Sequence, residues 1–182
     1  MKWRKILLCI IAICLALLVV IGKSRGSETV AQEKIVMVME YPYYNDFESL
    51  IADADQIVLG QVRGKYCEDV VIGRAAAELY LNPEDVPPDD MGVHTVYTVL
   101  TKDVYKGDAK INQEIEVRTI GGETDRYLHE VTPALKELET GAVYVFFLNE
   151  KGHPLNVSNA VRKVEGGVLS GTLADMLAEL KE

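Results

Sequence analysis

The feature that most constrains this chain is an uncharged, apolar run near its beginning. Residues 6–22 contain no charged side chain, and they follow Lys2, Arg4 and Lys5. As a helix this run would extend over about 25 Å, which approaches the thickness of the hydrocarbon core of a bilayer. A helix that is apolar on every face at the end of a chain has no domain around it in which to be buried. The sequence therefore predicts a signal anchor or signal peptide over residues 1–26, which contacts the membrane through residues 6–22.

Basic residues on both sides of the run set its expected orientation. Three basic side chains and the terminal amine precede it, whereas Lys23 and Arg25 follow it. This bias places the N-terminus in the cytoplasm and the rest of the chain outside, as a single-pass membrane protein. The alternative is a protein secreted after cleavage, but the small-x-small patterns at residues 24–26 and 29–31 are poor cleavage signals.

Charge separates the chain into two unlike parts. All 28 acidic residues lie at Glu28 or later, and five of the 19 basic residues precede it. The chain from residue 28 onward thus has 14 basic and 28 acidic residues and a net charge of -14. Because such a surface repels phosphate backbones, the charge excludes nucleic acid as a partner.

Cysteine usage fits an exported bacterial domain that does not depend on disulfides. Cys9 and Cys14 lie in the apolar run, so Cys67 is alone in the exported part and has no cysteine with which to pair. Small secreted domains of eukaryotes are usually cross-linked by several disulfides. We interpret Cys67 as a half-buried strand residue rather than a reactive thiol.

The exported part has the pattern of one mainly β domain with two helices. A polar tether at residues 27–34 precedes a domain at residues 35–182. Asn45-Asp46 caps a predicted short helix from Phe47, and Thr172 caps a terminal helix. The residues between them alternate or are β-branched and predict strands at 56–63, 93–106, 115–120 and 142–148, with shorter strands near 155–161 and 163–169. The length of 93–106 favours a strand that bends, as in a small barrel.

An inserted loop at residues 67–91 separates the first two strands. Residues 73–80 have a helical pattern, and residues 82–90 combine three prolines with four acidic residues, which excludes a strand or helix interior. The acidic residues are hard oxygen ligands of the type that calcium prefers. They form a weak calcium-site hypothesis for Glu84, Asp85, Asp89 and Asp90.

No catalytic or cofactor-binding motif occurs in the chain. His94, His129 and His153 are isolated, which favours surface or strand residues over zinc ligands. A Gly-x-Ser-x-Gly elbow and glycine-rich phosphate loops are absent. The glycosylation pattern Asn156-Val-Ser158 is interpreted as chance in a bacterial protein. We therefore predict no catalytic residues, no resident metal and no cofactor.

The order of the segments resembles a family of small exported proteins of Gram-positive bacteria. The resemblance covers residues 47–149 and depends on Ala52-Asp-Ala-Asp-Gln-Ile-Val-Leu-Gly-Gln-Val62, Thr95-Val-Tyr97, Lys106-Gly107, Gly121-Gly122 and Tyr144-Val-Phe-Phe-Leu148. The layout is also similar to the netrin-like barrel of the tissue inhibitors of metalloproteinases. That resemblance implies a five-stranded OB-like barrel, but it supplies no catalytic residues. The N-terminal cysteine and disulfides on which those inhibitors depend are missing here.

These observations together predict a mainly β (α+β) domain held outside a bacterial membrane. We expect a non-catalytic binding or interaction module, with a cell-envelope protein or glycan as its partner. One alternative is an exported hydrolase with carboxylate or metal chemistry. Another is a netrin-like module that inhibits proteases or binds proteins. The sequence does not indicate an oligomeric state.

Overall fold

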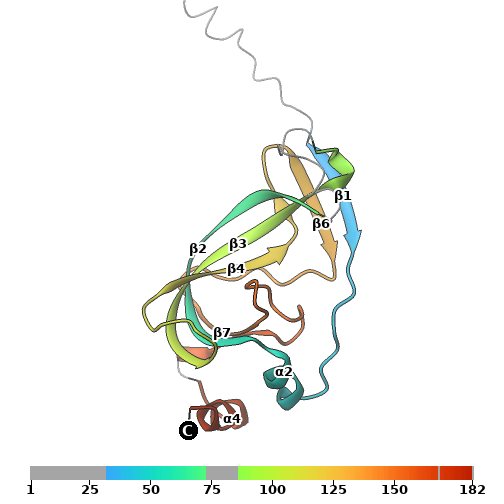
Figure 1. Cartoon of the computed structure of the whole chain (residues 1–182). Coiled ribbons are helices and arrows are strands. Elements are labelled where there is room, and N and C mark those ends of the chain that lie inside the picture. Colours follow the sequence, from blue (N-terminus) through green and yellow to red (C-terminus); the bar gives the residue numbers. More distant parts are fainter. Residues whose placement is uncertain (1–31, 73–85, 168, 182) are drawn as a thin grey trace, which may run out of the picture. The chain divides into compact units, whose positions relative to one another are not determined.

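A computed structural model describes residues 32–72, 86–167 and 169–181 of the chain (Figure 1). Within these ranges no helix is long and apolar enough to cross a membrane. The predicted membrane segment at 6–22 and the helix-like residues 73–80 lie outside them. The described residues form two sheets with two short α-helices, which confirms the mainly β fold class.

The larger sheet has five strands in the order β4-β3-β2-β7-β8, and its neighbouring strands are all antiparallel. The strands are β2 (Gln56–Val71), β3 (Met91–Lys106), β4 (Glu114–Ile120), β7 (Val143–Leu148) and β8 (Val161–Lys163). The pairing of β2 with β3 shifts register at three places between Ile57 and Gly64. Because such bulges increase bending and twist, the long pair curves, as the length of the second strand predicts (Figure 1).

Both ends of the predicted loop at 67–91 belong to this curved pair. β2 continues from Cys67, opposite Thr95, to Val71, opposite Met91. Of the remaining loop residues, the structure describes a 3-10 helix, η2, at Pro88–Asp90, in addition to Ile72, Val86 and Pro87. The sequence pattern did not indicate this extension of β2, because Glu68 and Asp69 interrupt its apolar residues.

The smaller sheet contains three strands, and the sequence patterns indicated none of them. Its order is β1-β6-β5, with β1 at Glu33–Val38, β5 at Gly122–Glu123 and β6 at Tyr127–Thr132. β1 begins inside the predicted tether and pairs with β6 in parallel. The chain leaves β4 through Gly121 and Gly122, whose φ angles of 100° and 140° lie in the region that favours glycine.

The predicted OB-like barrel is wrong in one respect, because the larger sheet does not close. Its end strands, β4 and β8, do not pair with each other. The sheet curls until the turn after β7 contacts the outer edge of β4, where the Arg118 N–H donates to the Gly152 carbonyl at 3.0 Å. A turn thus occupies the place that a closing strand would need, and β8, at three residues, is too short to replace it.

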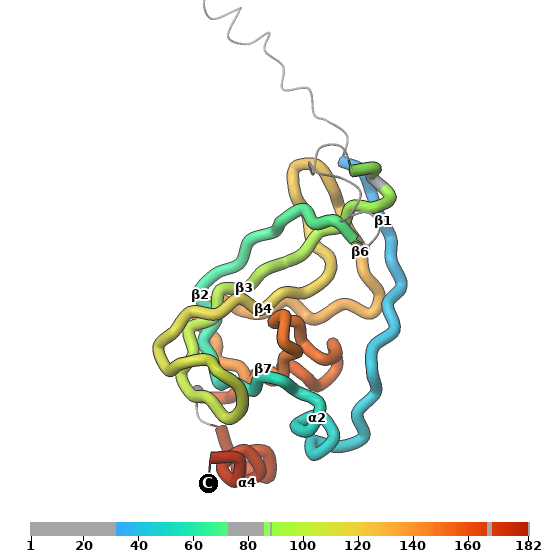
Figure 2. Tube along the Cα trace, viewed as in Figure 1, coloured from blue at the N-terminus to red at the C-terminus, as the bar shows by residue number. Residues whose placement is uncertain are grey.

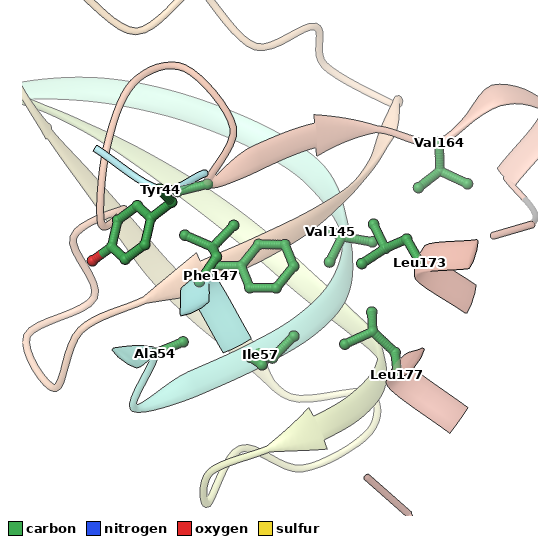
Figure 3. Packing of buried hydrophobic residues seen from close by; sticks show 10 residues of the cluster. Tyr44, Ala54, Ile57, Val145, Phe147, Val164, Leu173 and Leu177 are labelled. Carbon is green, nitrogen blue, oxygen red and sulfur yellow. The ribbon is translucent and has the colours of Figure 1, made fainter. Parts of the chain in front are cut away.

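Apolar residues cover both faces of the larger sheet. On one face Ile57, Val145 and Phe147 pack against the helices α2 (Phe47–Asp53) and α4 (Thr172–Glu179), as Figure 3 shows in part. On the other face a second cluster includes Val99 and Phe146. Since neighbouring residues of β7 point to opposite buried faces, its sequence is apolar throughout.

Capping of the two helices agrees with the prediction at α2 and differs at α4. Asp46 caps α2 by accepting a hydrogen bond from the Ser49 N–H at 2.8 Å. At α4 the N-cap residue is Gly171, which has no side chain to accept such a bond, and Thr172 is the first helical residue. The predicted strands at 155–161 and 163–169 reduce to β8, because the Asn156 side chain holds the preceding residues in a loop.

Candidate functional site

One cavity combines apolar walls with a small group of polar side chains, and we call it the histidine pocket. Its volume is about 550 Å³. Six separate parts of the chain line it: residues 39–42, the end of β2, the start of β3, the end of β4, Leu135 and the segment 149–157. Its apolar lining includes Met39, Tyr41, Val71, Ile72, Ile120, Leu135, Pro154, Leu155 and Val157, and its polar lining includes His94, Arg118 and His153.

His94 and His153 contact each other in this pocket although the sequence separates them widely. Their ring centroids are 5.2 Å apart and the rings are nearly perpendicular, at 79°. Burial lowers the pKa of His94 below its ordinary value, and the charges of His153 and Arg118 lower it further. Burial also lowers the pKa of His153, against which a hydrogen bond to the Arg118 backbone acts. Both imidazoles are therefore neutral at neutral pH and are available to donate or accept hydrogen bonds.

Arg118 places a fixed positive charge beside the two imidazoles. Its guanidinium pairs with Glu116 on its own strand and with Glu68 on β2, where Nε and Oε1 are 3.5 Å apart. The hydroxyl of Tyr66 donates to the other oxygen of Glu116 at 3.0 Å. These contacts hold the guanidinium at the wall of the pocket.

Asn156 ties two walls of the pocket together. The side chain is buried, and its Oδ1 accepts hydrogen bonds from the backbone of Ser158, Asn159 and Ala160. Its Nδ2 donates to the Pro42 carbonyl on the opposite wall at 3.2 Å. A glycan on Asn156 would displace these contacts, and the interpretation of the Asn156-Val-Ser158 pattern as chance stays a prediction.

His129 has a structural position outside the lining of this pocket. It lies on β6 and is 2% exposed, and burial lowers its pKa. Its Nδ1 accepts a hydrogen bond from the Val93 N–H at 3.1 Å, so the proton of the neutral ring is on Nε2. The imidazole thus satisfies a β3 donor at a point beyond the end of β4, and it joins the smaller sheet to the larger one.

Cys67 lines a second cavity, of about 580 Å³, together with Thr95, His129 and the glycines after β4. Its Sγ lies 3.6 Å from Thr95 Oγ1, and the Thr95 hydroxyl donates to the Gly121 carbonyl at 2.7 Å. Since the threonine proton is used there, the thiol is the donor in its contact with Thr95. Cys67 is half-buried in a strand, as the sequence interpretation expects.

The calcium hypothesis is only partly accessible to the structure. Asp89 and Asp90 lie in η2, whereas Glu84 and Asp85 lie outside the described residues. Among the residues that are described, no three His, Cys, Asp or Glu side chains are grouped so that they could hold a metal ion. Because half of the proposed ligand set is missing from that part, the calcium site stays a prediction.

Comparisons with known proteins give no relative from which a function could be transferred. The chain matches no protein-family model, no curated protein and no solved structure. The resemblance over residues 47–149 therefore stays a prediction.

The histidine pocket itself was missed by the sequence analysis, because its two histidines come from segments that only the curl of the larger sheet brings together.

Proposed function

We propose that this protein is a non-catalytic binding module on the extracytoplasmic side of a bacterial membrane, and that the histidine pocket is its ligand site. The apolar run at residues 6–22, behind basic residues, supports the membrane location. The acidic composition of the remaining chain supports a partner other than nucleic acid. The ligand is a component of the cell envelope, either a protein segment or a glycan.

The observation that carries this proposal is the pair of neutral imidazoles in a pocket with mostly apolar walls and few other polar groups. Ligand sites are typically concave and mostly apolar, have volumes of about 300–1,000 Å³, and contain a few polar groups that fix the orientation of the ligand. The histidine pocket has all of these properties. His94 and His153 can pair with hydroxyl or amide groups, which both peptides and sugars carry, and Tyr41 adds an aromatic surface of the kind on which such ligands pack.

Two tyrosines close together in the sequence allow a matched test. Tyr41 lines the pocket, whereas Tyr43 is 85% exposed and lies outside it. Full-length protein in detergent micelles would be immobilised as wild type, Tyr41→Ala and Tyr43→Ala and exposed to solubilised envelope from a Gram-positive bacterium. Components retained by the wild type would be identified by mass spectrometry and their affinities measured by calorimetry.

We expect Tyr41→Ala to weaken the binding of a retained component by about tenfold or more, which corresponds to about 1.4 kcal/mol. Tyr43→Ala should bind as the wild type does. Equal affinities for the wild type and Tyr41→Ala would show that the pocket is not the site. If the wild type retains neither protein nor glycan, the proposed surface binding role is wrong.

A further inference from the structure

Among the residues that the structure describes, β1 is an edge strand that hydrogen-bonds to a neighbour on one side only. It is the end member of the smaller sheet, and its pairs with β6 run from Glu33 with Tyr127 to Val38 with Thr132. Figure 2 shows its chain at the margin of the described residues, with β6 on the inner side. The outer side of β1 faces away from the rest of the described domain.

The register shows which backbone groups point outward. The Glu33 N–H donates to the Arg126 carbonyl at 3.0 Å, and the Met39 N–H donates to the Thr132 carbonyl at 2.9 Å. Since peptide groups alternate in direction along a strand, the odd-numbered residues face β6. Lys34, Val36 and Val38 therefore direct their N–H and carbonyl groups to the outer edge. A second strand could pair with all three.

The side chains of these residues leave the edge accessible and apolar. Val36 is 65% exposed and Val38 is 79% exposed. Lys34 is engaged with Glu130 on β6 in an ion pair of 2.9 Å. By contrast Ile35, which alternates with them, packs inward against a core cluster. Within the described residues, three outward-facing residues of a regular strand thus present an unpaired edge, and two of them, Val36 and Val38, are exposed and apolar.

The other edges in the described part of the domain are protected in recognised ways. β8 is three residues long and exposes Arg162 and Lys163. β4 carries several charged side chains, and the Gly152 carbonyl occupies part of its outer edge. Proteins usually shield edge strands by shortness, charge or cover, because an open edge pairs with other chains. Within β1 only Glu33 and Lys34, at its start, are charged, and no such device is described at Val36 and Val38, which suggests that this part of the edge has a use.

Charge indicates the kind of chain that would pair with this edge. Exposed carboxylates flank β1 at Glu33 and Glu40, and within the described part of the chain neither is paired with a basic side chain. From residue 28 onward the chain has a net charge of -14. Two copies meeting edge to edge would bring like charges together, whereas a basic partner would gain attraction.

We propose that the outer edge of β1 binds an extended segment of another protein by strand addition, and that this segment alternates apolar side chains and has basic residues at its ends. Main-chain hydrogen bonds to Lys34, Val36 and Val38 would supply affinity, and packing on the two valines would set the register. The two acidic residues would select the basic ends. This surface adjoins the histidine pocket, which Glu40 also lines, but the backbone edge at Lys34, Val36 and Val38 is not part of that pocket, so the inference extends the proposed function and does not depend on it.

The test uses a fluorescent probe peptide, Lys-Val-Thr-Val-Thr-Val-Lys, blocked at both ends, and full-length protein in detergent micelles. Binding would be followed by fluorescence anisotropy. One comparison peptide has Glu in place of both Lys. A second is N-methylated at every other residue, on the donors that would face β1. We expect each comparison peptide to bind at least about tenfold more weakly than the probe.

Variants of the protein locate the binding edge. Val36→Lys keeps the backbone and adds a charge to the edge, and Val36→Pro removes an N–H that points outward while the bonds to β6 remain. Both should reduce probe binding by about tenfold or more. Ile111→Lys is the matched control, because Ile111 is 58% exposed and lies in the connection between β3 and β4. Thermal melting would show whether each variant is folded, and Val36→Lys decides the test if Val36→Pro is not.

Several results would overturn the proposal. These are absence of probe binding, equal binding of the N-methylated peptide, or equal loss in Ile111→Lys and Val36→Lys. A dimer seen by sedimentation and abolished by Val36→Lys would assign the edge to a second copy of the chain. A loss of probe binding in Tyr41→Ala alone would assign the probe to the histidine pocket. Failure of the pocket proposal with a positive result here would leave the edge proposal intact.

Discussion

The two sheets of this domain differ in strand pairing, in the burial of their faces and in the protection of their edges. The larger sheet is antiparallel, buries apolar residues on both faces, and has edges that are short, charged or met by a turn. The smaller sheet has one parallel and one short antiparallel pair, packs through a few residues on the ends of β2 and β3, and within the described residues leaves one edge of β1 unpaired. The comparison teaches that most of the buried apolar contacts belong to the larger sheet, whereas the smaller sheet buries few residues of its own. The larger sheet stabilises the smaller one, because a small sheet with few buried residues is only marginally stable by itself.

Removing a large core side chain should have the greatest effect on the free energy of unfolding, and it should destabilise all parts of the domain together. Phe147 is fully buried between the larger sheet and the helices. Phe147→Ala should lower the free energy of unfolding by about 3–5 kcal/mol, through lost burial and the cavity left behind. Chemical denaturation followed by circular dichroism would measure it. Wild-type stability in this variant would contradict the assignment of stability to the larger sheet.

A smaller loss is expected where the two sheets are joined. His129→Leu would keep an apolar side chain of similar size but leave the buried Val93 N–H without its acceptor. An unsatisfied buried donor costs about 1–3 kcal/mol, but Leu also removes the buried Nε2–H of His129, which has no partner among the described residues, so the net loss should be at the low end, about 1 kcal/mol. Hydrogen exchange should show faster exchange in β1 and β6 than in β2 and β7. If all four strands change equally, the sheets unfold as one unit and the contrast between them is wrong.

The pH dependence of stability should report on the same junction and on the histidine pocket. The pKa values of His94, His129 and His153 are lower in the folded protein than their ordinary value of 6.5. Below pH 6.5 the unfolded chain therefore binds more protons than the folded one. Stability should be greatest above this pH and should fall as the pH decreases through the folded pKa values, by on the order of 1 kcal/mol per pH unit and proton.

Denaturation at pH 7.5, 6.5 and 5.5 would measure this decline. His153→Gln retains a side-chain donor for the Arg118 backbone but does not titrate, so the decline should be smaller in this variant. A wild-type stability that is constant from pH 7.5 to 5.5 would show that burial of the imidazoles has no such effect.

The ion pair on the smaller sheet should contribute least. Lys34 and Glu130 are both about half exposed, and surface pairs of this type contribute about 0–1 kcal/mol. Lys34→Ala should change the free energy of unfolding by less than about 0.5 kcal/mol, because backbone bonds and the packing of Ile35 hold β1 to β6. Thermal melting would test this. A loss comparable to that of His129→Leu would mean that charge, and not the ladder, holds β1.

Local patterns predicted much of the larger sheet and both helices. Asp46 before Phe47 indicated α2, and the apolar run ending at Leu148 indicated β7, because capping and burial on both faces act over a few neighbouring residues. β1 and β6 could not be predicted in this way. Their pairing joins residues that are far apart in the sequence, and nothing within either strand specifies the other.

The open larger sheet and the histidine pocket escaped prediction for a related reason. A curled sheet closes only if a strand pairs with its end strand. Here the turn at Gly152 hydrogen-bonds to the outer edge of β4 in place of such a strand. The same turn brings His153 against His94. The sequence spacing indicated three isolated histidines, because spacing alone does not show how strongly β2 and β3 bend or which distant residues this bending brings together.

The parallel pairing of β1 with residues 127–132 also sets an order of assembly. β1 is the first strand of the domain to be synthesised, yet its partner is made only after β2, β3 and β4 are complete. Contacts between distant parts of a chain form slowly because a long loop must close first. We therefore expect both edges of β1 to stay unpaired until β6 has formed, late in folding. In a cell this interval, rather than the finished fold, is when the segment is most exposed to aggregation and in greatest need of a chaperone.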